Sequence, residues 1–377
     1  MKPAAIALCL YPLCALRLLA DESPPKSEYR LLNVLSEELD YASGKLAMPD
    51  GTKPYYIAYT IVDHHQVGIQ AEMGALVGDE VGHQRMLDVD VRVGDYQLDN
   101  THKLRGGGFG FDPSDMYSQG ATNISIEDDA ASIKHAIWLA TDRTFKSAAK
   151  NYQRVQTNLK TKVEEEDKSN DFSKEDVSTS IQPSMTLSLN RKVWNERLRK
   201  VSRIARQYPL IYRSSVSLNA TALNRYMVTS EGTRLQTAGK YLRILLSAGT
   251  KAEDGMNLTQ SFIFSTSRED GLPSEIEMTE AFQKVIDQVL ALREAPLVEP
   301  YTGPGILVNR ASAVFFHEIF GHRIEGHRQK DVTEGQTFTK KIGEAVLPEF
   351  LSVYDDPTLK RHGDIDLRGT YQYDDEG

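Results

Sequence analysis

Apolar residues recur at helical spacing in four long segments of the chain. In the first segment the stripe consists of Leu31, Leu32, Leu35 and Leu39, and in the second of Ile133, Ile137, Leu139, Ala140 and Phe145. The four segments that this spacing predicts to be helical are 27–45, 128–162, 190–206 and 274–293. We therefore expect long amphipathic helices, each with one face against a sheet.

A period of two replaces the helical period in the segments between these helices. Residues 55–76 and 85–95 alternate apolar and polar side chains, as in Asp88-Val89-Asp90-Val91, which predicts half-buried antiparallel strands. Further strands are expected at 212–218, 224–229 and 241–246, with a turn at 230–232. The predicted fold class is α+β, with long helices packed on antiparallel sheets in two domains.

The length and the charge pattern suggest where these domains lie. A chain of 377 residues is long enough for about two domains. The acidic run at 164–171 is typical of a solvated linker. We expect a signal peptide at 1–20, an N-terminal α+β domain at 21–165, a charged linker at 166–185 and a second domain at 186–377.

Composition narrows the class of protein. Charged residues make up 26% of the chain and hydrophobic residues 40%, which is ordinary for a globular protein. The net charge of -9 argues against a nucleic-acid partner, because phosphate binding requires clustered Lys and Arg. No run is long and apolar enough for a stable membrane span. The glycine-rich segment 105–111 lacks the Gly-Lys-Ser/Thr ending of a phosphate-binding loop, so we interpret it as a turn.

The first twenty residues have the pattern of a secretory signal. Lys2 precedes an apolar run, and small Ala20 is followed by acidic Asp21. This pattern predicts export to the periplasm or the extracellular space. The alternative is a cytoplasmic protein in which the segment remains attached as an amphipathic helix.

The most informative stretch is His317-Glu318-Ile319-Phe320-Gly321-His322. Neutral imidazoles bind zinc well, and a carboxylate beside the first histidine is placed to accept a proton from a water molecule. The histidines are five residues apart, which on a regular helix separates them by about 140°. We therefore predict a local π-bulge, tolerated by Gly321, that brings both imidazoles to one ion.

The flanking sequence indicates how this helix is held. A turn at 303–305 precedes a short apolar strand at 306–309, and an apolar helix begins at 311–316. This order predicts a strand that delivers a buried helix carrying the ligands. A second histidine pair, His64 and His65, lies on a predicted strand, where adjacent side chains point to opposite faces, so this pair cannot easily share a metal.

These residues resemble a known family. Gly303-Pro304 followed by the apolar segment, and then residues 315–326 with His317, Glu318 and His322, are similar to the signature of the TldD/PmbA metallopeptidases, also called modulators of DNA gyrase. The resemblance extends less sharply from 191 to 377, and residues 50–110 resemble exported members. It implies a dimeric zinc (Zn2+) peptidase that cleaves small or unfolded peptides, with a homodimer or heterodimer of family members as the assembly. It also implies that His317 and His322 are metal ligands and that Glu318 is the general base.

The third zinc ligand of the resembled family is a downstream cysteine. The chain has two cysteines, Cys9 and Cys14, which lie in the N-terminal apolar segment and far from the motif in sequence. We therefore expect either a truncated catalytic domain or a substitute ligand. His327 is the leading substitute, because it follows Gly326 much as the third histidine of metzincins follows a glycine. The weaker candidates are Glu325, Asp355 and His362.

The sequence thus predicts a zinc-dependent metallopeptidase that hydrolyses small or unfolded peptides. The alternative is a non-catalytic partner subunit, or an inactive fragment, of a TldD/PmbA-type dimer. A third possibility, an exported binding protein without chemistry, requires the motif to be accidental.

Overall fold

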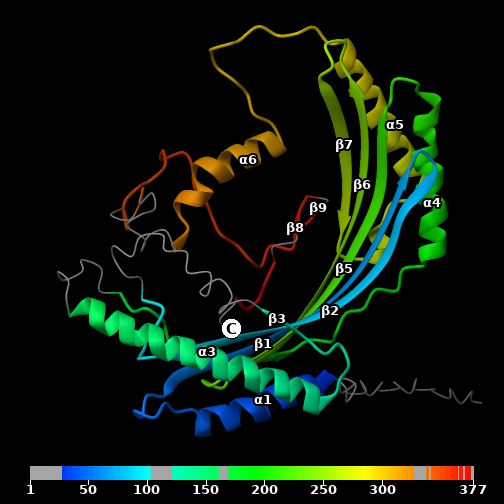
Figure 1. The fold of residues 1–377 in the computed structure, drawn as a ribbon. Helices are drawn as coiled ribbons and strands as arrows, with labels where there is room; N and C mark the ends of the chain where they lie inside the picture. The colour runs from blue at the N-terminus through cyan, green and yellow to red at the C-terminus, as the bar shows by residue number, and fades with distance from the viewer. Residues whose placement is uncertain are drawn as a thin grey trace, which may run out of the picture.

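The computed structural model describes residues 28–102, 121–160, 169–326, 337–338, 341–363, 365–367 and 370–374. A large, strongly curved sheet dominates this part of the chain, with helices on its outer face (Figure 1). The sheet has seven strands in the order β3-β2-β1-β5-β6-β4, and β7 pairs with β6. Its main strands are antiparallel, so the predicted α+β class is confirmed.

A long hairpin forms one half of the sheet. Its strands are β1 (Pro54–Glu72) and β2 (Ala75–Val93). Met73 and Gly74 connect them with φ values of 46° and 81°, the positive values that a two-residue hairpin turn with the right twist requires. The prediction of strands at 55–76 and 85–95 therefore missed this turn and residues 77–84 of β2, because Glu72-Met73-Gly74 lacks the usual Asn-Gly turn signal.

The other half of the sheet contains three long strands. They are β5 (Arg213–Thr229), β6 (Arg234–Lys251) and β7 (Asn257–Thr266). The predicted turn at 230–232 joins β5 to β6. Two short strands lie at the margins, β3 (Thr122–Ile124) on β2 and β4 (Thr179–Ile181), which runs parallel to β6.

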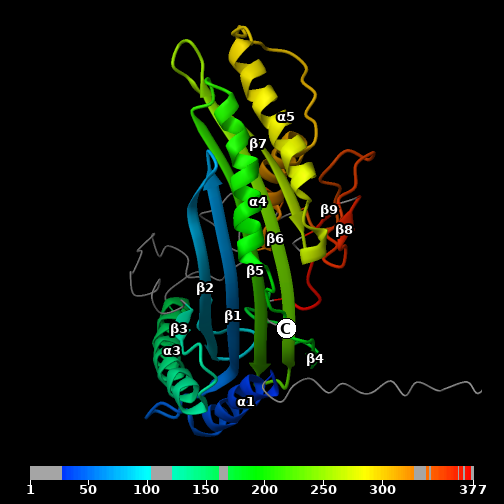
Figure 2. The ribbon, with the colours of Figure 1, turned by 90° about the vertical axis from the view of Figure 1, so that its right-hand side faces the viewer.

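Four long helices cover one face of the sheet, in agreement with the helical spacing. They are α1 (Glu28–Lys45), α3 (Ala130–Leu159), α4 (Arg191–Arg203) and α5 (Glu275–Glu294). Figures 1 and 2 show α1 and α3 against one end of the curved sheet and α4 and α5 against the other. Short 3-10 helices follow α4 (η1, Ile204–Gln207) and precede α5 (η2, Glu269–Gly271).

The helices produce two separate apolar cores on this convex face. Leu32, Leu35, Ile133 and Ile137 pack with Tyr59 of β1 in one core. Trp194, Leu198, Phe282 and Ile286 pack with Ile69 of β1 in the other. Of the predicted α3 stripe, Leu139 is the exception, since its side chain is exposed.

The sheet runs through the predicted domain boundary, because β1 pairs along its length with β5. β4 lies inside the predicted linker. The division into domains remains a prediction. The signal peptide at 1–20, the glycine-rich segment 105–111 and the start of the acidic run lie outside the described residues.

The C-terminal segment lies on the concave face of the sheet. It contains the short hairpin of β8 (Arg361–His362) and β9 (Ile365–Asp366). Asp366 accepts hydrogen bonds from the backbone N–H and the hydroxyl of Ser267, just after β7, each at 3.0 Å. Nη1 of Arg225 donates to the carbonyl of Asp374 at 2.7 Å. These contacts bring the C-terminal chain into the hollow of the sheet.

Candidate metal centre

The histidine motif lies on a short helix after an irregular connection. This helix is α6 (Arg310–Ile319), and the 3-10 helix η3 (Gly321–Arg323) follows it. The connection from 303 to 308 is exposed and contains no strand, so the predicted strand at 306–309 was wrong. Asn309 precedes the helix with φ and ψ angles of 52° and -123°, a conformation that is strained for a residue with a side chain.

The helix is broken between the two histidines. Phe320 has φ and ψ angles of -123° and -51°, while its N–H still bonds to the carbonyl of Phe316 at 3.0 Å. The next turn tightens, with the N–H of Ile324 donating to the carbonyl of Gly321 at 3.2 Å. The predicted deformation is therefore present, but the predicted π-bulge at Gly321 was wrong. The chain leaves the α-helix one residue earlier, at the buried Phe320, and continues as a tighter 3-10 helix.

The break brings the two imidazoles together. The ring centroids of His317 and His322 are 4.5 Å apart, with an angle of 69° between the ring planes. Each of His317, Glu318 and His322 offers one ligand atom, and these three atoms lie within 4.8 Å of one another. An undistorted helix could not bring residues five apart so close. The break in the helix thus brings two imidazoles and a carboxylate together, although a five-residue spacing would separate the imidazoles on a regular helix.

Two carboxylates flank His322. Its Nδ1 lies 2.7 Å from Oε1 of Glu325, and its Nε2 lies 3.7 Å from Oε2 of Glu318. An ionised carboxylate can only accept a hydrogen bond, so Nδ1 is the protonated nitrogen in the neutral ring. Nε2 is then the free ligand atom, and it faces the cluster. Glu325, a weak candidate for a third ligand in the sequence, instead pairs with Nδ1 of His322.

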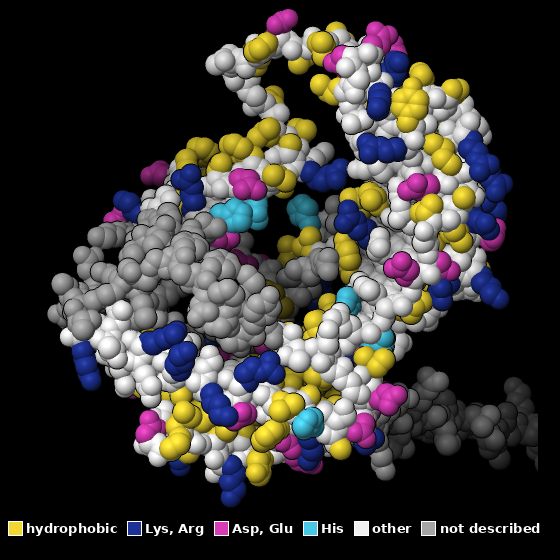
Figure 3. Space-filling view, in the orientation of Figure 1, with side chains coloured by type: hydrophobic (Ala, Val, Ile, Leu, Met, Phe, Trp, Pro, Cys, Tyr) yellow, Lys and Arg dark blue, Asp and Glu magenta, His cyan; other side chains and the backbone are white. Residues whose placement is uncertain are grey.

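The cluster is open to solvent. The side chains of Glu318 and His322 are 60% and 39% exposed, and in α6 itself every residue except Phe316 is exposed. The prediction of a buried helix was therefore wrong. Phe320 anchors the break, with its ring 5.2 Å from that of Phe316 and 5.9 Å from that of Phe338. Figure 3 shows a hollow between α6 and the concave face of the sheet, with histidine side chains at its rim.

The other proposed ligands are not brought to this cluster in the described part of the chain. His327 lies outside the described residues. Asp355 and His362 are exposed, and neither joins the group formed by His317, Glu318 and His322. A third protein ligand is therefore not found among the described residues.

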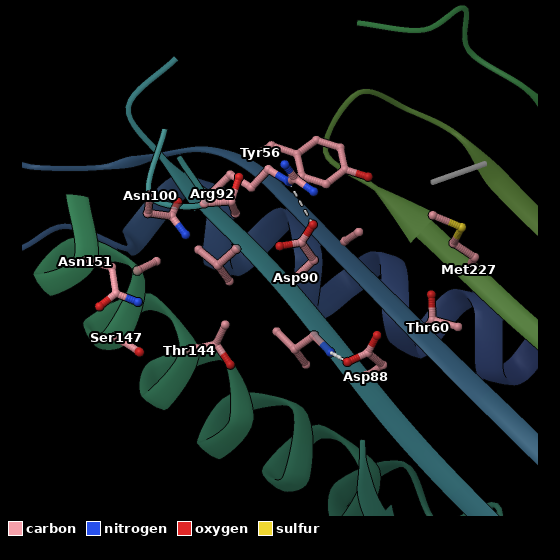
Figure 4. Close-up of a pocket in the computed structure, with 15 residues that line it drawn as sticks. Tyr56, Thr60, Asp88, Asp90, Arg92, Asn100, Thr144, Ser147, Asn151 and Met227 are labelled. Carbon is pink, nitrogen blue, oxygen red and sulfur yellow. Dashed lines mark hydrogen bonds and ion pairs between the residues drawn. The ribbon is translucent and has the colours of Figure 1, made fainter. Parts of the chain in front are cut away.

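A pocket of about 280 Å³ lies elsewhere, between β1, β2 and α3. Figure 4 shows Asp88, Asp90 and Arg92 at its wall, opposite Thr144 and Asn151 of α3. The Nε of Arg92 bonds to Asp90 at 2.9 Å, so these charges largely neutralise each other. The pocket contains no histidine and none of the residues of the motif. The histidine cluster therefore remains the stronger candidate for chemistry.

One group that the sequence analysis missed lies on the hairpin. Asp63, His65 and His83 also place their ligand atoms within 4.8 Å of one another. The turn at Met73-Gly74 and a register shift between Gln70 and Ala71 together place His65 opposite His83 and Asp63 opposite Arg85. The turn alone would place His65 opposite Gly82, so a correct turn assignment without the register shift would not have revealed this group.

Comparison with known proteins agrees with the motif. Residues 301–377 match the PmbA/TldA metallopeptidase C-terminal domain. A metalloprotease of Methanocaldococcus jannaschii is 28% identical over 174 residues, which cover 43% of this chain and 34% of that protein. The chain thus spans about a third of the length of this curated relative.

The fold of this chain resembles three solved structures only weakly. They are a modulator of DNA gyrase from Thermotoga maritima, TldE from Thermococcus kodakarensis and a modulator of DNA gyrase from Bacteroides thetaiotaomicron. Their TM-scores are 0.37, 0.40 and 0.41 at 10% identity, with 68% of this chain and 47 to 49% of theirs covered. Scores of this size carry no argument about the site.

The fold is of the α+β class, and residues 301–377 are similar to the C-terminal domain of the PmbA/TldA metallopeptidases.

Proposed function

We propose that this protein is a zinc-dependent metallopeptidase and that His317, Glu318 and His322 form its catalytic group. The observation that carries the proposal is the broken helix, which brings three potential ligand atoms within 4.8 Å of one another. The family match supports metal-dependent peptide hydrolysis. Membership of a metallopeptidase family implies a metal ion, and the choice of zinc rests on the imidazole donors.

The residues fit a catalytic zinc site in part. His317 and His322 would hold the ion, and Glu325 fixes the tautomer that presents Nε2 of His322. A catalytic zinc ordinarily has three protein ligands, so one ligand must come from outside the described residues. His327 remains a proposed source, because it is four residues from the end of η3 in sequence.

The chemistry divides between the metal and Glu318. A zinc ion at this position would supply Lewis acidity, which makes a water molecule more nucleophilic and polarises a peptide carbonyl. Glu318, whose side chain is 60% exposed beside His322, can accept the proton of that water and pass it to the leaving amine. Its exposure allows both the water and a substrate to reach the carboxylate.

The open site favours peptides in extended form as substrates. The side chains of Glu318 and His322 are open to solvent, so an extended peptide backbone could reach them directly. We propose small or unfolded peptides as the substrate class.

Assembly and location complete the proposal. Ile306, Val308, Val314 and Phe315 are 91%, 64%, 58% and 52% exposed, and such an apolar surface is typical of a protein contact. We propose that a second family member, identical or not, covers this surface in a dimer. The N-terminal apolar segment supports export. None of the described helices is both long and apolar enough to cross a membrane.

The direct test is Glu318→Gln in the full chain. This substitution keeps the size of the side chain and removes the proton acceptor, so hydrolysis of an unfolded peptide substrate should fall at least ~100-fold while zinc content is unchanged. Glu344→Gln is the matched control, because Glu344 is also exposed and pairs only locally with Lys341 at 2.7 Å. Undiminished cleavage by the Glu318 variant would reject the assignment.

A non-catalytic partner subunit is the alternative function. The described residues provide two imidazoles but no third ligand, which favours a supporting role over catalysis by this chain alone. Comparison of the zinc content of the parent and the His322→Ala variant separates the two, because a supporting subunit without a complete site at the motif would lose no zinc with this substitution.

A further inference from the structure

A second group of metal-binding side chains lies on the convex face of the sheet, far along the chain from the motif. We name Asp63, His65 and His83 the hairpin triad. Asp63 and His65 are two residues apart on β1, so their side chains share a face, and His83 lies directly opposite His65 on β2. The triad occupies the gap between the two helix-covered cores, since Ile61 belongs to one core and Val67 to the other.

The three side chains converge on one oxygen atom. Oδ1 of Asp63 lies 2.6 Å from Nε2 of His83 and 3.4 Å from Nε2 of His65. The two imidazole rings stack with centroids 4.0 Å apart and 19° between their planes, and both Nε2 atoms lie near Oδ1 of Asp63. Such parallel imidazoles beside a carboxylate oxygen form half of a coordination sphere.

Arg85 fixes the carboxylate of Asp63 from its other side. Nη2 and Nε of Arg85 donate to Oδ2 of Asp63 at 2.6 and 3.2 Å. Arg85 is itself held by Asp128, whose Oδ1 lies 2.9 Å from Nη1. Oδ1 of Asp63 therefore remains available to the histidines, and hydrogen bonds of this kind commonly orient metal ligands.

The local charge favours a cation. Two carboxylates, Asp63 and Asp128, surround the single guanidinium of Arg85, which leaves one negative charge when the imidazoles are neutral. Neutral imidazole is the form that binds a metal.

The three side chains differ in their exposure to solvent. The side chain of Asp63 is 8% exposed, whereas those of His83 and His65 are 27% and 36% exposed. On the neighbouring strand Asn224 lies beside Asp63, and its side chain is tied to the backbone of Met185 at 2.7 and 3.1 Å. A buried anchor with two accessible imidazoles allows an ion to enter from solvent without unfolding the sheet.

We propose that the hairpin triad binds a divalent transition-metal ion, of the kind that prefers imidazole and carboxylate donors, and that this ion clamps β1 to β2. Tetrahedral coordination at bond lengths of about 2.0–2.1 Å separates ligand atoms by about 3.3 Å. The contact of His65 with Asp63 already has this length, and the partly exposed ring of His83 moves outward by less than about 1 Å. Water completes the coordination sphere on the solvent side.

The test uses Zn2+ as the probe and the full chain with His317→Ala and His322→Ala, so that zinc at the motif cannot contribute. Zinc affinity is measured by competition with a chromogenic chelator. If the hairpin triad binds the ion, the chain with His317→Ala and His322→Ala, called the background protein, should still bind zinc. Adding His65→Gln to it should weaken zinc binding at least ~10-fold. His64→Gln is the matched control, because His64 precedes His65 on the same strand and faces the opposite side of the sheet, and it should leave the affinity unchanged.

A second measurement guards against misfolding. His65 is 36% exposed, so its replacement should preserve the fold, which the thermal unfolding midpoint without metal checks. With excess Zn2+ the midpoint of the background protein should rise, and that of the His65 variant should not. Equal zinc affinity in the background, the His65→Gln variant and the His64→Gln control would overturn the proposal, as would the absence of zinc binding in the background. Neither result bears on catalysis at the motif.

Discussion

Nδ1 of His322 lies 2.7 Å from the carboxylate of Glu325, three residues further along the chain. The contact fixes which nitrogen of the imidazole carries the proton and directs Nε2 toward Glu318. It forms across the 3-10 helix that follows the break in α6, so the same backbone feature that brings His317 and His322 together also places this acceptor.

Replacing Glu325 should therefore weaken metal binding without removing a ligand. We expect Glu325→Ala to lower zinc affinity by about 10–100-fold, because outer carboxylates orient ligating histidines and raise their basicity. Glu325→Gln, which retains an acceptor oxygen, should lower zinc affinity less than Glu325→Ala does. Chelator competition measures both affinities in a chain that carries His65→Gln. Equal affinities for Glu325→Ala and the parent would show that Glu325 does not act on His322.

The hairpin turn provides a test of stability that is independent of the site. Gly74 has a φ of +81°, and an added Cβ would lie 3.0 Å from Cβ of Arg203. Gly74→Ala should lower the free energy of unfolding by at least about 1–2 kcal/mol, because an L-residue is strained in this conformation. The midpoint of urea unfolding measures the change.

Gly44 is the matched control for that substitution. It is an exposed helical residue of α1, and an added Cβ would meet nothing within 4 Å. Gly44→Ala should stabilise the protein by up to about 1 kcal/mol, because alanine has the higher helix propensity. Similar urea midpoints for the two variants would contradict the role assigned to the turn.

Acid should loosen the C-terminal segment from the sheet. Hydrogen bonds from the backbone and side chain of Ser267 hold the pKa of Asp366 below its usual 3.8. A lowered pKa in the folded state means that this carboxylate stabilises the attachment above about pH 3.8 and that the contribution is lost as the pH falls through the folded value. Hydrogen exchange of residues 361–367 should therefore be less protected at pH 3 than at pH 6, after correction for intrinsic rates.

Asp366→Asn should show the weakened protection already at pH 6. Asp356→Asn is the control, because the lowered pKa of Asp356 comes from hydrogen bonds with Thr358 within the same segment. That variant should leave exchange at 361–367 unchanged. If both variants behave like the parent, Asp366 does not anchor the segment.

The regular elements were predictable because local patterns decide them. The leucines of α1 and the alternation around Asp88-Val89-Asp90-Val91 gave the correct element types, since one face of each is buried by the sheet or by helices. The N-caps Asn190 and Ser274 also lie at the predicted helix starts. The turn at Met73-Gly74 was missed because methionine carries no turn signal, and its left-handed φ is imposed by the strands that it joins.

Features that depend on tertiary contacts could not be predicted in the same way. The apolar residues around α6 suggested a buried strand and helix, but in the described chain they face solvent. The spacing of His317 and His322 predicted a deformation correctly but not its type, because the spacing does not determine which residue leaves the α-helical conformation, here Phe320. The hairpin triad required the register of β1 and β2, which depends on the missed turn and on the register shift between Gln70 and Ala71.

Zinc content tests the central claim most directly. The full chain carrying His65→Gln and His83→Gln, purified and supplemented with zinc, is compared with the same protein carrying His322→Ala, and both are analysed for metal after dialysis. The account predicts about one zinc ion per chain in the first protein and its loss in the second. Absence of zinc from the first protein, or equal zinc in both, would contradict the assignment of His317 and His322 as metal ligands.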